Sequence, residues 1–167
     1  MTRSNIVLIG MAGAGKSTVG QTLAEQLGYD FLDTDQLIES QREQTLQTIL
    51  DETGYLGLRD AEEHSLLSIK AKHTVIATGG SAVYSVKAMH HLKRTAYVVY
   101  LEVSLGTVID RIGDYSQRGL AKPAEQTLAS VFEERCALYQ QYADFSLAAN
   151  DLSPAQAAQA IASKLGI

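Results

Sequence analysis

The sequence of 167 residues has no tryptophan, only two prolines and a single cysteine, Cys136. One cysteine excludes a disulfide within the chain and any metal cluster that needs several cysteines. No run of about 18 apolar residues occurs, so we expect no transmembrane helix and no membrane partner. Since no secretory apolar segment follows the first residues either, the sequence predicts a cytoplasmic protein.

An excess of basic residues is also missing, because the formal net charge is −5. General nucleic-acid binders carry a basic excess, so we expect no nucleic-acid partner. The hydrophobic content of 46% and the charged content of 20% are ordinary for a globular protein. A chain of this length supports one domain with its own core, and we expect residues 1–167 to form it, as a monomer.

A glycine-rich segment, GMAGAGKST at residues 10–18, lies between an apolar run at 5–9 and a helical pattern at 19–27. It fits G-x-x-x-x-G-K-[ST] in the strand–loop–helix context that this phosphate-binding pattern requires. The glycines let backbone N–H groups turn toward phosphate oxygens, and the following helix adds its positive end. Lys16 supplies a charge for the outer phosphates, and the Ser17 hydroxyl can bind Mg²⁺. A glycine turn that binds nothing is the alternative.

Two aspartates end the second apolar segment, residues 29–32. If the backbone stays extended, Asp33 and Asp35 project to the same side, at the carboxyl end of a strand where open α/β sheets bind ligands. The alternative role is to cap the helix that follows, which Asp33, Thr34 or Asp35 could do. We expect at least one of the two carboxylates to belong to the site.

Residues 36–71 are predicted to be helical, with a break near 51–54. Arg59, Glu62 and Glu63 share a helix face. The spacing by itself favours a surface ion pair, which contributes little. The alternative is an arginine that is held by Glu62 and points at an anionic substrate.

Three further strands are predicted at 74–78, 95–101 and 145–149, the first of them central and buried. Gly79 and Gly80 follow it and either let a backbone N–H approach a ligand or form a plain turn. Alternating strands and helices predict an α/β fold with a five-stranded parallel sheet and helices on both faces. The remaining helices are expected at 85–91, 105–112, 124–142 and 155–165.

Residues 113–123 are polar, contain two glycines and a proline, and lack periodicity. In a protein with a phosphate-binding loop, this pattern indicates a mobile lid that brings Arg118 to the phosphates. An exposed loop without this role is the alternative.

Taken together, the motifs resemble those of the shikimate kinase family, nearly from end to end. They are GMAGAGKSTVG at 10–20, FLDTD at 31–35, RDAEE at 59–63, ATGG at 77–80, VVYLE at 98–102, Arg118, and Arg135 before Leu138-Tyr139. The resemblance implies the P-loop kinase fold, a lid at about 113–123 and a substrate-binding helical segment at about 34–62. It also implies ATP-dependent phosphorylation of the 3-hydroxyl of shikimate, giving shikimate 3-phosphate, in aromatic amino-acid biosynthesis.

The resemblance also implies residue roles, and it favours the functional role of Arg59. ATP and Mg²⁺ would be bound by the loop and its neighbours, namely Gly13, Ala14, Gly15, Lys16, Ser17, Thr18, Arg111 near adenine and Arg118 on the phosphates. Ser17 and, through water, Asp33 would hold the metal. The substrate would contact Asp35 at its hydroxyls, Arg59 and Arg135 at its carboxylate, and the backbone at Gly79 and Gly80. Lys16, Asp35 and Arg118 would be catalytic.

Three positions depart from the family pattern. Ser81 stands where a third glycine is usual, Gly119 where the lid usually has proline, and Ala137 where proline is expected. The phosphoryl-transfer motifs are intact, so the acceptor is the open question. The alternatives are a related kinase acting on another hydroxy acid or a sugar acid such as gluconate, a nucleoside monophosphate kinase, and a regulatory paralogue that binds nucleotide without turnover.

Overall fold

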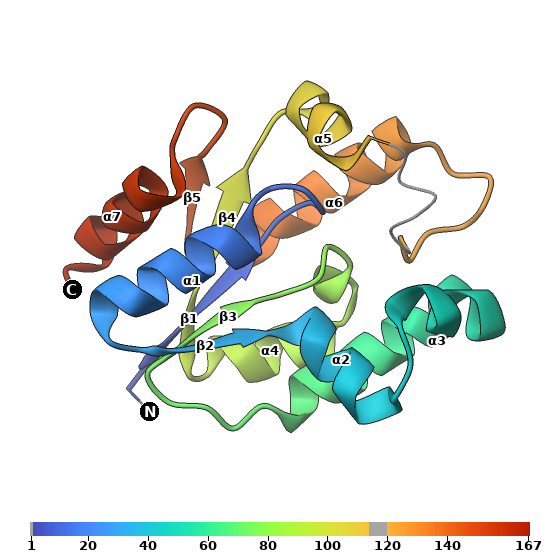
Figure 1. Cartoon of the computed structure of the whole chain (residues 1–167), viewed down its shortest axis with the longest axis horizontal. Coiled ribbons are helices and arrows are strands. Elements are labelled where there is room, and N and C mark those ends of the chain that lie inside the picture. The colour runs from blue at the N-terminus through green and yellow to red at the C-terminus, as the bar shows by residue number, and fades with distance from the viewer. Residues whose placement is uncertain (1, 114–119) are drawn as a thin grey trace.

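The computed structural model describes residues 2–113 and 120–167 (Figure 1). Five strands form one sheet, in the order β2-β3-β1-β4-β5, and every neighbouring pair is parallel. The strands are β1 (Asn5–Ile9), β2 (Asp30–Asp33), β3 (Thr74–Ala77), β4 (Ala96–Glu102) and β5 (Phe145–Ala148). The predicted five-stranded parallel sheet is therefore confirmed.

The middle of the sheet is β1, and every residue of β1 and β3 is buried. Val7 lies opposite Ile76 of β3 on one side and Val98 of β4 on the other. The segment predicted to be central, β3, is an interior strand but not the middle one. Its apolar, β-branched composition indicates burial on both faces, which any of the three interior positions in a five-stranded sheet satisfies.

Helices cover both faces of the sheet, as predicted (Figure 1). On one face, α1 (Lys16–Leu27) packs against α7 (Pro154–Leu165). On the other face lie α4 (Val86–Lys93), α6 (Leu128–Tyr142) and part of α3 (Leu46–Ser68). The remaining elements are α2 (Thr34–Arg42), the short 3₁₀ helix η1 (Ala82–Tyr84) and α5 (Leu105–Ile112). Within the described residues, no helix has the length and apolar character needed to cross a membrane.

Residues 29–35 do not stay extended throughout, and the alternative of a helix cap is confirmed. Strand β2 ends at Asp33, whose side chain accepts a hydrogen bond from the Asp35 backbone N–H at 2.9 Å and caps α2. Asp35 therefore lies in the first turn of α2 rather than beside Asp33 on a strand. A carboxylate at the N-cap satisfies a backbone N–H that the helix leaves without a partner, so the chain turns there.

Two helices, α2 and α3, replace the long helical segment predicted at 36–71. The chain breaks at Glu43, which has a positive φ of 54°, and α3 is then kinked at Gly54, inside the predicted break. A small second core lies between these helices and also takes in Ala121. It consists of Ile38, Ile49, Leu58, Ala61 and Ala121. The helix predicted from residue 124 begins only at Leu128, because Thr127 caps it through the Ser130 N–H.

A buried asparagine fixes the start of β3 against β1. Asn5 donates from Nδ2 to the Ala71 carbonyl at 2.8 Å and accepts from the Thr74 N–H at 3.1 Å. Only 1% of its surface is exposed, so water cannot replace either partner.

We expect Asn5→Ala to lower the free energy of unfolding by about 2 kcal/mol, because the buried Thr74 N–H and the partly buried Ala71 carbonyl lose their partner. Urea unfolding followed by circular dichroism measures this loss. Asn150→Ala is the matched control, since exposed Asn150 accepts from the Ser104 N–H at 2.9 Å. Equal losses of unfolding free energy in the two variants would show that the burial of Asn5 does not increase the cost of removing its hydrogen bonds.

Candidate active site

The phosphate-binding loop joins the carboxyl end of β1 to the first turn of α1, as the sequence predicts. Gly13 and Gly15 have φ angles of 80° and 91°, a region that side-chain-bearing residues rarely adopt. Lys16 is buried, and its ammonium group donates to the carbonyl oxygens of Gly10 and Met11 at 2.6 and 2.7 Å. The lysine charge is thus held against the loop at the positive end of α1.

Oxygen ligands suited to a metal ion meet beside this loop. The Ser17 hydroxyl donates to Asp33 Oδ2 at 2.7 Å, which joins α1 to the end of β2. Hydroxyl and carboxylate oxygens are the ligands that Mg²⁺ prefers, so this pair fits the predicted ion. The described residues contain no cluster of three or more His, Cys, Asp or Glu side chains able to hold a metal. A magnesium ion here would need further oxygens from water and from the nucleotide.

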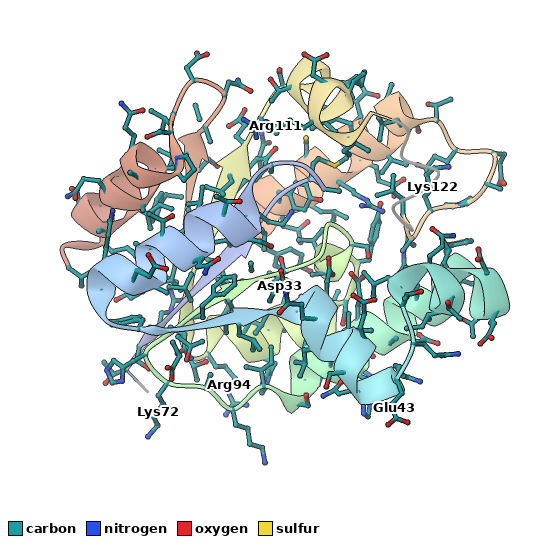
Figure 2. All side chains as sticks on the ribbon, viewed as in Figure 1. Asp33, Glu43, Lys72, Arg94, Arg111 and Lys122 are labelled. Atoms are coloured by element: carbon teal, nitrogen blue, oxygen red, sulfur yellow. The ribbon has the colours of Figure 1, made fainter. Side chains whose placement is uncertain are left out.

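Arg111 of α5 approaches the loop from the other side and donates to the Gly13 carbonyl at 3.1 Å. In Figure 2 the labelled Asp33 and Arg111 lie on either side of the loop that precedes α1. Arg111 therefore lies beside the phosphate-binding loop, and its place next to a nucleotide stays a prediction.

A cavity of about 720 Å³ runs along the carboxyl ends of the strands. Most of the predicted site residues line it, namely Gly13, Ala14, Gly15, Lys16, Ser17, Thr18, Asp35, Gly79, Gly80, Arg111 and Arg135. Asp33 and Arg59 are not among the lining residues and are joined to it through Ser17 and Ala121. Arg118 and Gly119 lie outside the described residues.

Gly79 and Gly80 connect the two halves of the cavity. A Cβ on Gly79 would collide with Glu62 Oε1 and would lie 2.9 Å from Asp35 Oδ1. A Cβ on Gly80 would lie 2.9 Å from Arg135 Nη1 and 3.3 Å from the backbone nitrogen of Ala12. The backbone here therefore passes so close to the ends of three ionisable side chains that a Cβ would require them to move.

The two predicted arginines converge on one oxygen atom. Arg59 donates through Nε and Nη2 to the Ala121 carbonyl at 3.2 and 3.0 Å, and Arg135 donates through Nη2 to the same oxygen at 3.1 Å. Arg135 is 1% exposed, and its Nε has no hydrogen-bond partner among the described residues. The pair can therefore hold a planar anion from two directions, as guanidinium groups do with carboxylates.

The structure corrects the expectation that Glu62 holds Arg59. Glu62 instead accepts a short hydrogen bond from the Ser81 hydroxyl, while Arg59 donates to Ala121. The departure at Ser81 thus supplies a partner for a buried carboxyl group. Burial raises the pKa of Glu62 from 4.5 to about 7, and the Asp35 carboxylate adds to this, whereas Ser81, Arg135 and Arg59 act in the opposite direction.

Sequence reasoning missed a second wall of the cavity. The segment between β5 and α7 contributes Ala149 and Leu152, and the first turn of α7 contributes Pro154 and Ala157. The sequence predicts a strand at 145–149 and a helix at 155–165 here without a role in the site, and Ser153 caps α7 with Pro154 at its first position. Their place after a strand of a parallel sheet was the available signal, because ligands bind beyond the carboxyl ends of such strands.

This arrangement places the chain in a class, the P-loop kinases. The loop and Lys16 can hold a polyphosphate at one end of the cavity, while Asp35 and Arg135 present a carboxylate and a guanidinium group to a second molecule. An APS kinase of Mycobacterium tuberculosis has the same fold, with a TM-score of 0.58 and 14% identity over 99% of this chain and 98% of its own.

Within this class, the chain belongs to the shikimate kinase family, whose model matches residues 12–166. A shikimate kinase of Sulfurihydrogenibium sp. is 35% identical, over 96% of this chain and 97% of its own. The structure of a shikimate kinase from Acinetobacter baumannii in complex with shikimate has a TM-score of 0.90 and 34% identity, covering 98% and 93% of the two chains. The family, the fold and the enzyme class, an ATP-dependent phosphotransferase acting on a hydroxyl group, are thus confirmed.

The raised pKa of Glu62 predicts a pH-dependent stability. The native state binds this proton more tightly than the unfolded chain does, so the protonated carboxyl stabilises the protein below pH 4.5, and this contribution is lost as the pH rises to about 7. Between these pH values the free energy of unfolding of the wild type should fall by up to about 3 kcal/mol relative to that of Glu62→Gln, since each pKa unit corresponds to about 1.4 kcal/mol.

Urea unfolding of both proteins at several pH values between these limits measures the difference, and titrations common to the two cancel. If the difference in unfolding free energy between the two proteins stays constant with pH, the pKa of Glu62 is not raised in the folded protein.

Proposed function

We propose that this protein transfers the γ-phosphoryl group of ATP to the 3-hydroxyl of shikimate, giving shikimate 3-phosphate and ADP. The observation that carries the proposal is the shared cavity, lined by the phosphate-binding loop, Asp35 and Arg135, with Arg59 donating to the same oxygen as Arg135. The relative from Acinetobacter baumannii, described in complex with shikimate, supports this acceptor. The whole chain, residues 1–167, would act as one domain, with residues 34–62 as the substrate-binding segment and 113–123 as the lid.

The nucleotide would lie along the loop. Backbone N–H groups of residues 13–18 would bind its phosphates, and Lys16 would neutralise charge on the transferred group. Arg111 would lie beside the adenine, and Arg118 would reach the phosphates. The tight loop and the Lys16 ammonium held beside it support this assignment.

Ser17 and, through water, Asp33 would hold Mg²⁺, and the 2.7 Å contact between their oxygens supports this pairing. The ion supplies charge neutralisation between the β- and γ-phosphates when it is bound. Ser17 and Asp33 would serve to position their oxygens, and the cap that Asp33 provides to α2 keeps its carboxylate in place.

The acceptor would be held at both ends. Arg59 and Arg135 would bind its carboxylate, and the Ala121 oxygen that they share supports a convergent grip. Asp35 would orient the reacting hydroxyl, whose oxygen bonds to the γ-phosphorus as the bond to the ADP oxygen breaks. The hydroxyl proton would pass to Asp35, and the backbone at Gly79 and Gly80 would contact the ring substituents.

The test is an assay coupled to ADP release, with shikimate, gluconate and AMP as acceptors. ADP release that rises above background with shikimate, and not with gluconate or AMP, supports the proposal. Turnover with gluconate or AMP in its place would point to the related kinases, and ATP binding without turnover on any acceptor would point to a regulatory paralogue. The monomeric state, the cytoplasmic location and the absence of nucleic-acid and membrane partners stay predictions.

We expect Lys16→Ala to lower kcat by about a hundredfold or more, because a preorganised charge at the transferred group is lost. Steady-state kinetics with saturating shikimate and ATP measures it. Lys164→Ala is the control, since Lys164 lies on α7 over the Phe145 ring. Near-normal turnover of the Lys16 variant would rule out the assigned role of the loop.

Arg59→Ala should raise the KM for shikimate by about 10- to 100-fold and leave the KM for ATP unchanged, because a charged hydrogen-bond donor to the substrate is removed. Arg59→Lys should restore little of the affinity for shikimate, since lysine lacks the planar fork of donors of a guanidinium group. An equal increase in the KM values for shikimate and ATP would contradict a role confined to the acceptor.

A further inference from the structure

Tyr84 has no role in the proposed mechanism, yet it contacts both arginines of the acceptor site. It ends η1, the turn that follows Gly79, Gly80 and Ser81. The Arg59 guanidinium carbon lies 3.7 Å from the centre of the Tyr84 ring, and that of Arg135 lies 5.5 Å from it. Tyr55 of α3 faces Arg59 as well, at 5.0 Å.

The Tyr84 ring is anchored at its hydroxyl. Tyr84 Oη donates to Glu134 Oε1 at 2.5 Å, and Gln126 donates to the other oxygen of this carboxylate at 3.3 Å. Glu134 directly precedes Arg135 on α6. One aromatic side chain therefore joins Arg59 of α3 to the helix that carries Arg135.

Two positive groups that reach one oxygen atom repel each other, and Arg135 is almost completely buried. Glu62, a buried carboxyl group, accepts its hydrogen bond from Ser81 and not from either arginine. The electron-rich face of an aromatic ring attracts a guanidinium group and restricts it to one plane. Tyr84 thus offers compensation that does not require another buried negative charge.

We propose that Tyr84 is a positioning residue for the acceptor carboxylate. Its ring holds the Arg59 guanidinium group in the plane in which Arg59 and Arg135 converge, and its bond to Glu134 fixes the ring. The inference rests on the proposed function, because it takes a carboxylate-bearing acceptor such as shikimate as the group that the two arginines bind.

The central test is the kinetics of Tyr84→Leu. We expect the KM for shikimate to rise about tenfold, with kcat and the KM for ATP within about twofold of wild type, because only acceptor binding loses a preorganised donor. Tyr84→Phe keeps the ring and should retain most of the affinity. Tyr97→Leu is the matched control, since it removes the stacking of Arg3 on Tyr97, at 5.4 Å, outside the cavity.

Two further measurements separate positioning from a general structural effect. With the methyl ester of shikimate, which lacks the carboxylate charge, Tyr84→Leu should change KM by less than about twofold. In an Arg59→Ala background, Tyr84→Leu should raise the KM for shikimate little further, because the guanidinium group that Tyr84 positions is gone. Equal effects on shikimate and its ester, or full additivity with Arg59→Ala, would overturn the inference.

A second variant covers the case in which Tyr84→Leu does not fold. Glu134 is exposed, and Glu134→Ala removes the anchor of the Tyr84 hydroxyl together with the hydrogen bond from Gln126. It should raise the KM for shikimate by about threefold. If the wild type phosphorylates shikimate and neither variant changes its KM, the inference alone fails. If the wild type does not use shikimate, the proposed function fails and this assignment fails with it.

Discussion

The backbone of Gly79 and Gly80 passes close to the side chains of Glu62, Asp35 and Arg135 and to the backbone of the phosphate-binding loop, so a Cβ on either residue would displace a neighbouring group. This close passage depends on the parallel order of the sheet, in which β3 lies between β1 and β2. The loop after β1, the aspartates after β2 and the glycines after β3 therefore meet at one edge. A shift of β3 would therefore move the backbone that lies against Glu62, Asp35, Arg135 and the phosphate-binding loop.

Several charged or ionisable groups are buried around this passage, and burial without compensation is unfavourable. The structure compensates in three ways. Glu62 binds Ser81 and carries a raised pKa, the two arginines share the Ala121 carbonyl, and the Tyr84 ring faces both guanidinium groups. Ala121 also belongs to the small core between α2 and α3, so this residue of the predicted lid segment, 113–123, is packed against these helices while its carbonyl binds the two arginines. Compensated buried charges suit a phosphotransferase, which must exclude water while it holds charged substrates.

Much of the fold was predictable, because the apolar runs are short, β-branched and separated by clear glycine and capping signals. The boundaries that were wrong lie where a side chain competes with the regular pattern. Asp33 caps α2, which begins at Thr34 rather than at residue 36, Glu43 adopts a left-handed conformation between α2 and α3, and Thr127 delays the start of α6. Such caps depend on a local choice between two hydrogen-bonding partners, which periodicity does not report. The departure at Ser81 was noticed in the sequence, but its partner, Glu62, was not.

The sequence alone determined the phosphate-binding loop, the five parallel strands and the family, because each depends on residues that are close together in the chain or on their order along it. It also named Asp35, Arg59 and Arg135, through the resemblance rather than through their spacing. Tertiary structure alone decided which groups are partners: Glu62 with Ser81, Arg59 and Arg135 with Ala121, and Tyr84 with Glu134. These pairs join residues 14 to 62 positions apart, and their choice depends on how helices pack across the sheet, which no local pattern encodes.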